Sequence, residues 1–466
     1  MRDDRRRFLL RTGGATAAFA TLVAQARALP LLGRGAALGA RPLPAQPNAP
    51  PAQPNAPSPL PLRDGDYRPS VTPDGATLPF RVVDGVKVFH LVAQDVTHEF
   101  APGLVGECYG FNGRVHGPTL EAVEGDRVRI YVTNRLSVST SVHWHGIRLP
   151  NGMDGVGGLT QRPIEPGETF KYEFALPDAG SFMYHSHHDE MTQMAMGLMG
   201  MFVVHPRRPS EPLPDRDFVY MLSEWKLEPG TRRPDPNEMT DFNVLTMNGR
   251  IYPGTMPLAV RRGERVRLRI GNLSAMDHHP IHLHGHAFTV VATDGGDVPK
   301  SARYPETSVL VPVGAVRVIE FVADNPGDWP LHCHMTHHVM TQMGHGLPNL
   351  IGTDHGRFDE ALSRHVPAFE QVGSDSGAMD GGMAGMGGDE AALDESHDPT
   401  IPRNSLPMMG GSGPHGYITM GGMFTLLQVR DELAADGGAG GWYQAPPGTR
   451  ADVASDADVE RDGIAP

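Results

Sequence analysis

The chain has 466 residues, of which 39% are hydrophobic and 20% charged, and its formal net charge is -14 at pH 7. This length allows two or three hydrophobic cores, and the acidic balance argues against nucleic acid or anionic membrane surfaces as partners. Only two cysteines are present, Cys108 and Cys333, so a disulfide-rich scaffold is excluded.

The N-terminus resembles an export signal. Arginines at positions 5 to 7 precede a mildly apolar stretch, and residues 26–28 (Ala, Arg, Ala) have the small-x-small form of a cleavage site. We expect a twin-arginine signal peptide over residues 1–28 and a periplasmic or secreted protein; an uncleaved anchor is the alternative. Residues 29–79 are rich in Pro and Ala and contain PAQPNAP twice, which predicts a polyproline-like linker.

From about Arg81 the pattern changes to short alternating runs such as VKVFHLVAQDV, DRVRIYVTN and FKYEFALP, separated by turn residues. This pattern predicts an all-β protein. An internal repeat is present, because NGRVHGPTLEAVEGDRVRIYVTN from Asn112 is similar to NGRIYPGTMPLAVRRGERVRLRIGN from Asn248. We therefore predict two copies of one β-sandwich, over residues 80–207 and 215–358.

Pairs of histidines separated by one residue occur in both copies. Alternate side chains of a strand project from the same face, so each pair points to one side of its sheet. The eight histidines are His143, His145, His185 and His187 in the first copy and His282, His284, His332 and His334 in the second. Eight imidazoles suit a cluster of three copper ions.

A second metal site is predicted around Cys333, whose side chain leaves the strand opposite to the two histidines that flank it. A cysteine, two histidines and a weak axial methionine are the ligands of a blue copper centre. His338 and Met343, five and ten residues past Cys333, supply the loop ligands, with Met340 the next candidate for the axial position. His279 lies an odd number of residues before His282 and therefore faces the cysteine side.

The first copy lacks these ligands. It has Thr140 where the second copy has His279, and Ser186 where the second copy has Cys333. We therefore expect a blue copper site in the second copy alone.

The four histidine motifs resemble those of the multicopper oxidases, and the resemblance covers roughly residues 80 to 355. It implies two cupredoxin-like Greek-key domains and four copper ions per subunit. A type 1 copper would take single electrons from a small reducing substrate, and a type 2/type 3 trinuclear cluster would reduce O2 to water. By the same resemblance His143 and His282 hold the type 2 copper, and the other six histidines hold the type 3 pair.

The spacing resembles that of the two-domain, small laccase-like members. His187 and His279 are 92 residues apart, which leaves no room for a further sandwich between the second and third motifs. The resemblance implies a homotrimer in which each cluster forms between the first domain of one subunit and the second domain of its neighbour. A monomer with an intramolecular cluster is the alternative.

Asp154, nine residues after His145, is the predicted catalytic residue. In bacterial family members an aspartate at this place relays protons to bound oxygen, although an aspartate in NGMDG can also simply form a turn. Many members carry an acidic residue directly after the histidine that follows the cysteine by five positions. This chain has Val339 there, so Glu190 or water is expected to serve as any second relay.

Residues 359–466 form a Gly- and Met-rich extension that we expect to be largely disordered, although residues 417–429 could add a strand. Thioethers suit Cu(I), so the methionines of this tail could collect cuprous ion. Met194, Met196, Met199 and Met201 instead read as core residues of a buried strand.

The predicted function is an oxidase that couples one-electron oxidation of phenols, aromatic amines or Cu(I) to the reduction of O2. Two alternatives are a copper nitrite reductase and a periplasmic copper-resistance protein that sequesters the metal. The eight histidines argue against the nitrite reductase, which needs only a single type 2 copper. The complete ligand set argues against a protein that only sequesters the metal.

Overall fold

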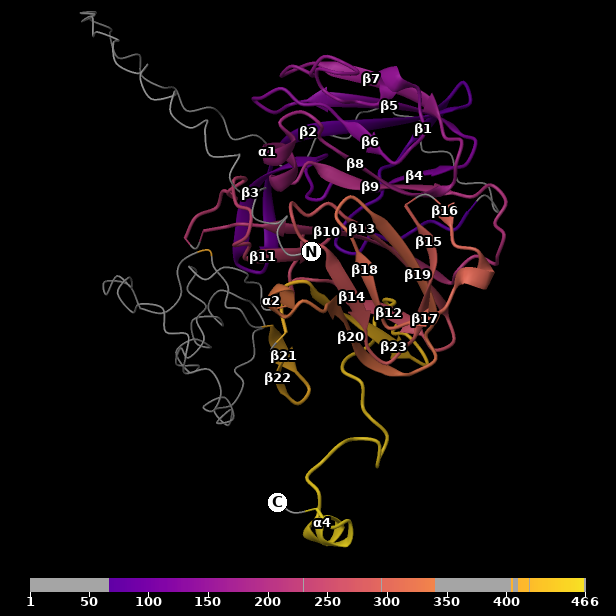
Figure 1. Ribbon diagram of the computed structural model, residues 1–466, viewed down its shortest axis with the longest axis vertical. Helices are drawn as coiled ribbons and strands as arrows, with labels where there is room; N and C mark the ends of the chain where they lie inside the picture. Colours follow the sequence, from indigo (N-terminus) through magenta and orange to yellow (C-terminus); the bar gives the residue numbers. More distant parts are fainter. Residues whose placement is uncertain are drawn as a thin grey trace, which may run out of the picture. The chain divides into compact units, whose positions relative to one another are not determined.

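The computed structural model describes residues 67–228, 230–294, 296–339, 404, 410–418 and 420–464. Strands dominate these residues, which confirms the all-β prediction (Figure 1). The helices are short: α1 (Glu190–Ala195), α2 (Thr336–Val339), α4 (Asp456–Arg461) and the 3-10 turns η1 (Asn151–Met153) and η2 (Lys300–Ala302). Within the described residues no helix has the length and apolar character needed to cross a membrane.

The first sandwich is formed by two sheets. One has the order β1-β2-β5-β7, with β3 paired to β2, and the other has the order β4-β9-β8-β6. The strands of the first sheet are β1 (Arg81–Val83), β2 (Val86–Ala101), β3 (Leu104–Phe111), β5 (Arg127–Asn134) and β7 (Thr169–Ala175). Those of the second are β4 (Leu120–Val123), β6 (His143–His145), β8 (Gly180–His185) and β9 (Met199–His205).

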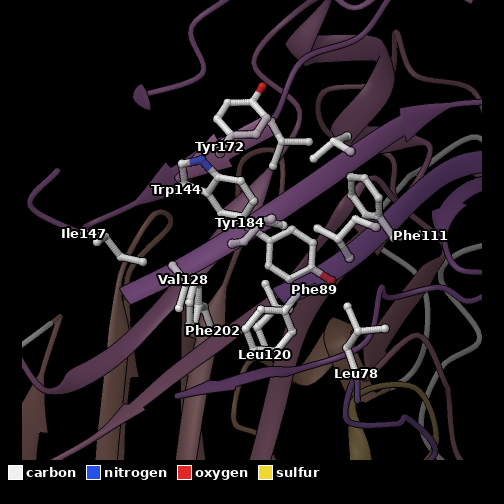
Figure 2. Close-up of a cluster of buried hydrophobic side chains, with 14 of the residues drawn as sticks. Leu78, Phe89, Phe111, Leu120, Val128, Trp144, Ile147, Tyr172, Tyr184 and Phe202 are labelled. Atoms are coloured by element: carbon white, nitrogen blue, oxygen red, sulfur yellow. The ribbon is translucent and has the colours of Figure 1, made fainter. Parts of the chain in front are cut away.

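Aromatic side chains fill the space between these two sheets. Trp144 is fully buried, and its ring centroid lies 5.2 Å from that of Tyr172 and 6.3 Å from that of Tyr184. Figure 2 shows these rings together with Phe89 and Phe202 in one continuous cluster. Because Trp144 points into this core, its neighbours His143 and His145 must point away from it, as strand alternation requires. Burial of Trp144 therefore orients two of the predicted ligands.

The second sandwich repeats the same topology. One sheet has the order β11-β10-β13-β19-β15-β16, with β17 on β15, and the other has the order β12-β23-β20-β14-β18. The first contains β10 (Arg216–Trp225), β11 (Val244–Met247), β13 (Arg265–Asn272), β15 (Phe288–Thr293), β16 (Gly296–Asp297), β17 (Pro305–Glu306) and β19 (Val316–Val322). The second contains β12 (Leu258–Arg261), β14 (His279–Leu283), β18 (Ser308–Val311), β20 (Gly327–Cys333) and β23 (Phe424–Arg430), and β21 (Gly411–Gly413) pairs separately with β22 (Gly416–Ile418).

Strand pairing shows which elements of the two copies correspond. β2 pairs with β5 in parallel, as β10 does with β13, and β4 pairs with β9 in parallel, as β12 does with β23. β8 lies antiparallel between β6 and β9, as β20 lies between β14 and β23. The internal repeat of the sequence is therefore a repeat of structure.

The C-terminal boundary differs from the prediction. The second domain does not end at residue 358, because β23 lies between β12 and β20 (Figure 1). This strand overlaps residues 417–429 of the extension, for which an added strand is the predicted alternative to disorder. Met423, Leu427 and Val429 are buried in the core of this domain, and without β23 the edges of β12 and β20 would lose their partner. Residues 359–403 of the extension lie outside the described residues.

The N-terminal boundary also differs, since residues 67–79 belong to the folded region and not to the linker. The amide of Leu78 donates to the carbonyl of Thr119 at 2.8 Å, and the Leu78 side chain is buried in the first core. The amide of Val71 donates to the carbonyl of Asp217 at 2.8 Å, so this segment bridges both domains. The predicted twin-arginine signal over residues 1–28 and residues 29–66 lie outside the described residues.

The two sandwiches share a buried contact. Met183, Met199 and Met201 of the first domain pack with Met221 and Val318 of the second, which confirms that the methionines of β9 are core residues.

The same contact holds a buried ion pair. Arg269 binds both carboxylate oxygens of Asp217 at 2.8 Å and donates to Ser181 of the first domain at 2.8 Å. The ion pair lies within the second domain, and the hydrogen bond from Arg269 to Ser181 links it to the first domain.

The structure predicts that β23 is required for folding. A chain ending at residue 409 should lose cooperative thermal unfolding, because it lacks a central strand, whereas a chain ending at residue 450 should unfold like the full-length protein. Leu427→Ala should lower the free energy of unfolding by about 2–5 kcal/mol through the cavity it leaves. Circular dichroism and calorimetry would measure these effects. Equal unfolding temperatures for the chains ending at 409 and 450 would contradict the role of β23.

Candidate metal centres

Three predicted ligands converge at the end of β20. The Sγ atom of Cys333 lies 3.3 Å from Nδ1 of His338 and 3.7 Å from Nδ1 of His279, and the two nitrogens are 3.0 Å apart. All three side chains are 0% exposed. Two imidazole nitrogens and one sulfur in a compact triangle fit the trigonal arrangement of a blue copper site.

The surroundings of this triangle orient both imidazoles. Ser274 hydrogen-bonds Nε2 of His279 at 2.7 Å, which leaves Nδ1 facing the thiol. Nε2 of His338 lies 3.6 Å from Oδ2 of Asp277. Burial raises the pKa of Cys333 to about 12, so a bound cation would have to displace a proton from the thiol.

Two carboxyl groups, those of Glu224 and Asp277, lie close together beside His338, with Asp277 next to the imidazole. Oε1 of Glu224 accepts the amides of Met276 and Asp277 at 2.5 and 3.2 Å, which holds the loop before His279. Burial raises the pKa of Glu224 to about 8, whereas the nearby imidazole of His338 lowers the pKa of Asp277. The sequence alone does not indicate this pair, because Glu224 and Asp277 are far apart in the chain and neither belongs to a recognisable motif.

The first domain has hydrogen-bonded polar residues in the equivalent place. Gln193 is buried, and its Oε1 accepts from the hydroxyls of Thr140 and Ser186, both at 2.6 Å. These three residues have no thiol or imidazole. Gln193 was not predicted, because it lies seven residues past Ser186 whereas His338 lies five past Cys333.

Four histidines of the first domain gather at the ends of β6 and β8. The strand register places His143 opposite His185, and the ring centroids of this group lie 5.4–6.0 Å apart. The group consists of His143, His145, His185 and His187.

The second domain holds a matching group at the ends of β14 and β20. The register places His282 opposite His332, the centroids lie 4.7–5.6 Å apart, and Nε2 of His284 is 3.1 Å from Nε2 of His332. The group consists of His282, His284, His332 and His334. As the alternation predicts, Ile281 pairs with Cys333 and points into the core instead.

Backbone carbonyls hold one nitrogen of several of these rings. Nδ1 of His185 donates to the carbonyl of Ser186, and Nδ1 of His332 donates to the carbonyl of Cys333, both at 2.8 Å. Nδ1 of His143 donates to the carbonyl of Asp154 at 2.8 Å, and that of His282 to the carbonyl of Thr307 at 2.6 Å. Such bonds fix the tautomer and leave Nε2 free to bind a metal. Burial lowers the pKa of His185 to about 3 and that of His332 to about 4, so both rings are neutral at pH 7.

The two histidine groups are separate. Each ring contact found among these eight histidines joins members of the same domain. Nε2 of His145 bonds the carbonyl of Gly314 in the second domain at 2.9 Å rather than a histidine there. His334 is exposed and His187 half-buried, whereas His185 and His332 are buried.

Acidic residues flank the first group. Asp154 has Oδ1 3.4 Å from Nδ1 of His143. The next residue, Gly155, has φ +88°, and an added Cβ would lie 1.7 Å from the carbonyl of Val142, so only glycine allows this loop to approach the strand. Glu190 has its oxygens 3.8 Å from Nδ1 of His185 and 3.7 Å from Nε2 of His187.

Two further expectations concern single residues. The predicted axial ligand Met343 and its alternative Met340 lie outside the described residues. Cys108 is a buried free cysteine in an apolar cluster.

Comparison with known proteins gives the family. Models described as multicopper oxidase match residues 93–209 and 228–350, just over half of the chain together. Copper resistance protein A of Escherichia coli is 30% identical over 333 residues, covering 61% of this chain and 52% of that protein. Laccase-19 of Oryza sativa subsp. japonica is 31% identical over 245 residues, covering 49% of this chain and 40% of that protein.

A solved multicopper oxidase structure is 28% identical, has a TM-score of 0.50, and covers 60% of this chain and 92% of that one. The chain spans about half the length of the curated relatives it matches, or less. The two matched regions contain both histidine groups and the triangle of His279, Cys333 and His338. The chain belongs to the multicopper oxidase family, whose members bind copper.

Proposed function

We propose that the protein is a laccase-like oxidase that takes single electrons from a small reductant and uses four of them to reduce O2 to water. The observation that carries the proposal is the geometry of β20, on which Cys333 belongs to a buried triangle of two nitrogens and one sulfur while His332 belongs to a histidine group on the opposite face. Bound copper would supply the one-electron chemistry at both sites. The protein supplies ligands, a connection between the sites and protons.

The proposed type 1 ligands are His279, Cys333 and His338. The proposed cluster ligands are His143, His145, His185, His187, His282, His284, His332 and His334. Cys333 connects the two sites through the shortest covalent route, because its neighbours on both sides are cluster ligands. Asp154 is the proposed proton donor, since its carboxylate lies beside His143, and Glu190 is a second group placed to do the same.

Phenols, aromatic amines and Cu(I) are the proposed reductants. The relative named laccase-19 supports phenols as reductants. The relative named copper resistance protein A supports Cu(I). Steady-state kinetics of the copper-loaded protein with a phenol and with Cu(I) would separate a laccase from a cuprous oxidase. Copper uptake without O2 consumption would instead indicate a sequestering protein. The two histidine groups disfavour a nitrite reductase, which needs one type 2 copper.

The proposed assembly is a homotrimer with clusters at the subunit interfaces. Within one chain the ring contacts of the eight histidines stay inside each group, and the proposed cluster of three ions would need both groups. A contact between unlike surfaces closes into a ring when its rotation permits. We further propose export by the twin-arginine signal over residues 1–28 to the periplasm or the exterior.

Cys333→Ser should separate the two kinds of copper. The substitution removes the only proposed thiolate ligand, so the intense blue absorption should disappear, while type 2 copper remains visible by electron paramagnetic resonance. Cys108→Ser is the matched control and should stay blue, because Cys108 lies in a different cluster. A blue Cys333→Ser protein would overturn the assignment.

Asp154→Asn should slow the reduction of oxygen. Asparagine has nearly the same shape as aspartate, and the backbone carbonyl of residue 154 can still accept the hydrogen bond from His143. Its side-chain amide cannot exchange protons as a carboxyl group does, so O2 consumption should fall by about 100-fold or more. Anaerobic bleaching of the blue colour by a phenol should not change, since Asp154 is not part of that site. Asp178→Asn, which alters a surface ion pair with Arg148, is the control. Normal O2 consumption by Asp154→Asn would show that it is a turn residue only.

Subunit mixing tests the shared cluster. His143→Ala and His334→Ala subunits should each be inactive alone, because each lacks one half-site ligand. In mixed trimers about a quarter of the interfaces should combine two intact half-sites, and activity should recover to that extent. A mixture of His143→Ala with His185→Ala should not recover, because both defects lie in the first domain. No recovery in the first mixture after demonstrated exchange, or a monomer by sedimentation, would contradict the model.

A further inference from the structure

The triangle of His279, Cys333 and His338 has a further buried neighbour, Met423. It is 0% exposed and belongs to the same core cluster as Cys333. Its backbone contacts both ligands: the amide of Cys333 donates to the carbonyl of Met423 at 3.0 Å, and the amide of Met423 donates to the carbonyl of His338 at 3.2 Å. Met423 is therefore fixed between two of the three ligands.

The first domain shows which position Met423 occupies. There the amide of Ser186 donates to the carbonyl of Leu198 at 3.0 Å, and the amide of Leu198 donates to the carbonyl of Gln193 at 3.0 Å. Ser186 corresponds to Cys333 and Gln193 to His338, so Leu198 corresponds to Met423.

The preceding glycines agree with this correspondence. Gly197 and Gly422 both have positive φ, +109° and +55°. Each also accepts a hydrogen bond from the residue two positions later, Met199 at 2.8 Å and Phe424 at 2.9 Å. The two copies therefore enter their last strands, β9 and β23, by the same turn.

The substituted residues form a consistent set. Where the second domain has two imidazoles and a thiol, the first has Thr140, Gln193 and Ser186, which hydrogen-bond one another. At the remaining position the first domain has leucine, which has no donor atom, and the second has methionine. A thioether is the weak axial donor of blue copper sites.

We propose that Met423 is the axial ligand of the type 1 copper, supplied by the C-terminal extension and not by the loop that carries Met343. This inference rests on the proposed function. Met423 lies beyond the residues that the family models match, which end at residue 350. Met420, three residues earlier, packs with Tyr252 and Phe424 in a separate cluster and is the natural control.

The test compares substitutions at three methionines in the copper-loaded, full-length protein. Met423→Leu removes the donor and should raise the type 1 reduction potential, whereas Met423→Gln provides a harder oxygen donor and should lower it. Both should stay blue, with altered electron paramagnetic resonance hyperfine splitting. Met343→Leu and Met420→Leu should leave the potential and the spectrum unchanged. Leucine should fold normally at position 423, because Leu198 occupies the equivalent place and the swap conserves volume.

Shifts of opposite sign for the two Met423 variants would support the proposal, since damage to the fold would not change sign with the donor. A shift in Met343→Leu with none at Met423 would overturn it, as would unchanged potentials in all variants. A wild-type protein that binds copper without any blue band would instead refute the proposed function, so the two failures are distinguishable.

Discussion

The pairing of β20 with β14 on one side and β23 on the other is the constraint on which both proposed metal centres depend. It fixes the pleat of β20, so that Cys333 points into the sandwich while His332 points out of it. The two sites are thus separated by the thickness of one strand. A slip of one residue in either pairing would exchange the faces and destroy both sites together.

In the first domain, hydrogen bonds take the place of a metal at the position equivalent to the triangle of His279, Cys333 and His338. A buried hydroxyl or amide needs a hydrogen-bond partner, and leaving one unpaired costs about 1–3 kcal/mol. Thr140 and Ser186 both donate to Gln193, so each of the three polar groups has a partner. At the same positions the second domain has His279, Cys333 and His338, whose side chains can bind one another only weakly. Its thiol and imidazole nitrogens are suited to a cation, and a metal would complete them.

How much the sequence predicts depends on the range of the interaction. Alternation along a strand is local, so the faces of His282 and His332 and the lack of a metal ligand at Thr140 follow from the residues alone. Residues that meet only through tertiary contacts cannot be paired from the sequence alone. Glu224 is 53 residues from Asp277, and the equivalence of Gln193 with His338 is hidden by a different loop length.

The domain boundaries show the same difference. Composition indicated a linker up to residue 79 and a disordered extension from residue 359, because Pro, Gly and Met tracts lie next to both ends of the fold. The structure instead includes residues 67–79 and β23, since pairing and burial of a few apolar side chains suffice to attach them. Closing the loop from Cys333 to Met423, compared with the short loop from Ser186 to Leu198, costs only about 2 kcal/mol more. Burial of β23 can offset that cost.

The late position of β23 has a consequence for biosynthesis. Cys333 and His338 leave the ribosome about 90 residues before Met423, yet their backbone bonds require it. During translation the thiol of Cys333 therefore has no complete sheet around it, and the site can close only when residues 420–430 have emerged. A chain that stops before these residues would therefore leave Cys333 and His338 without the strand that their backbone bonds require.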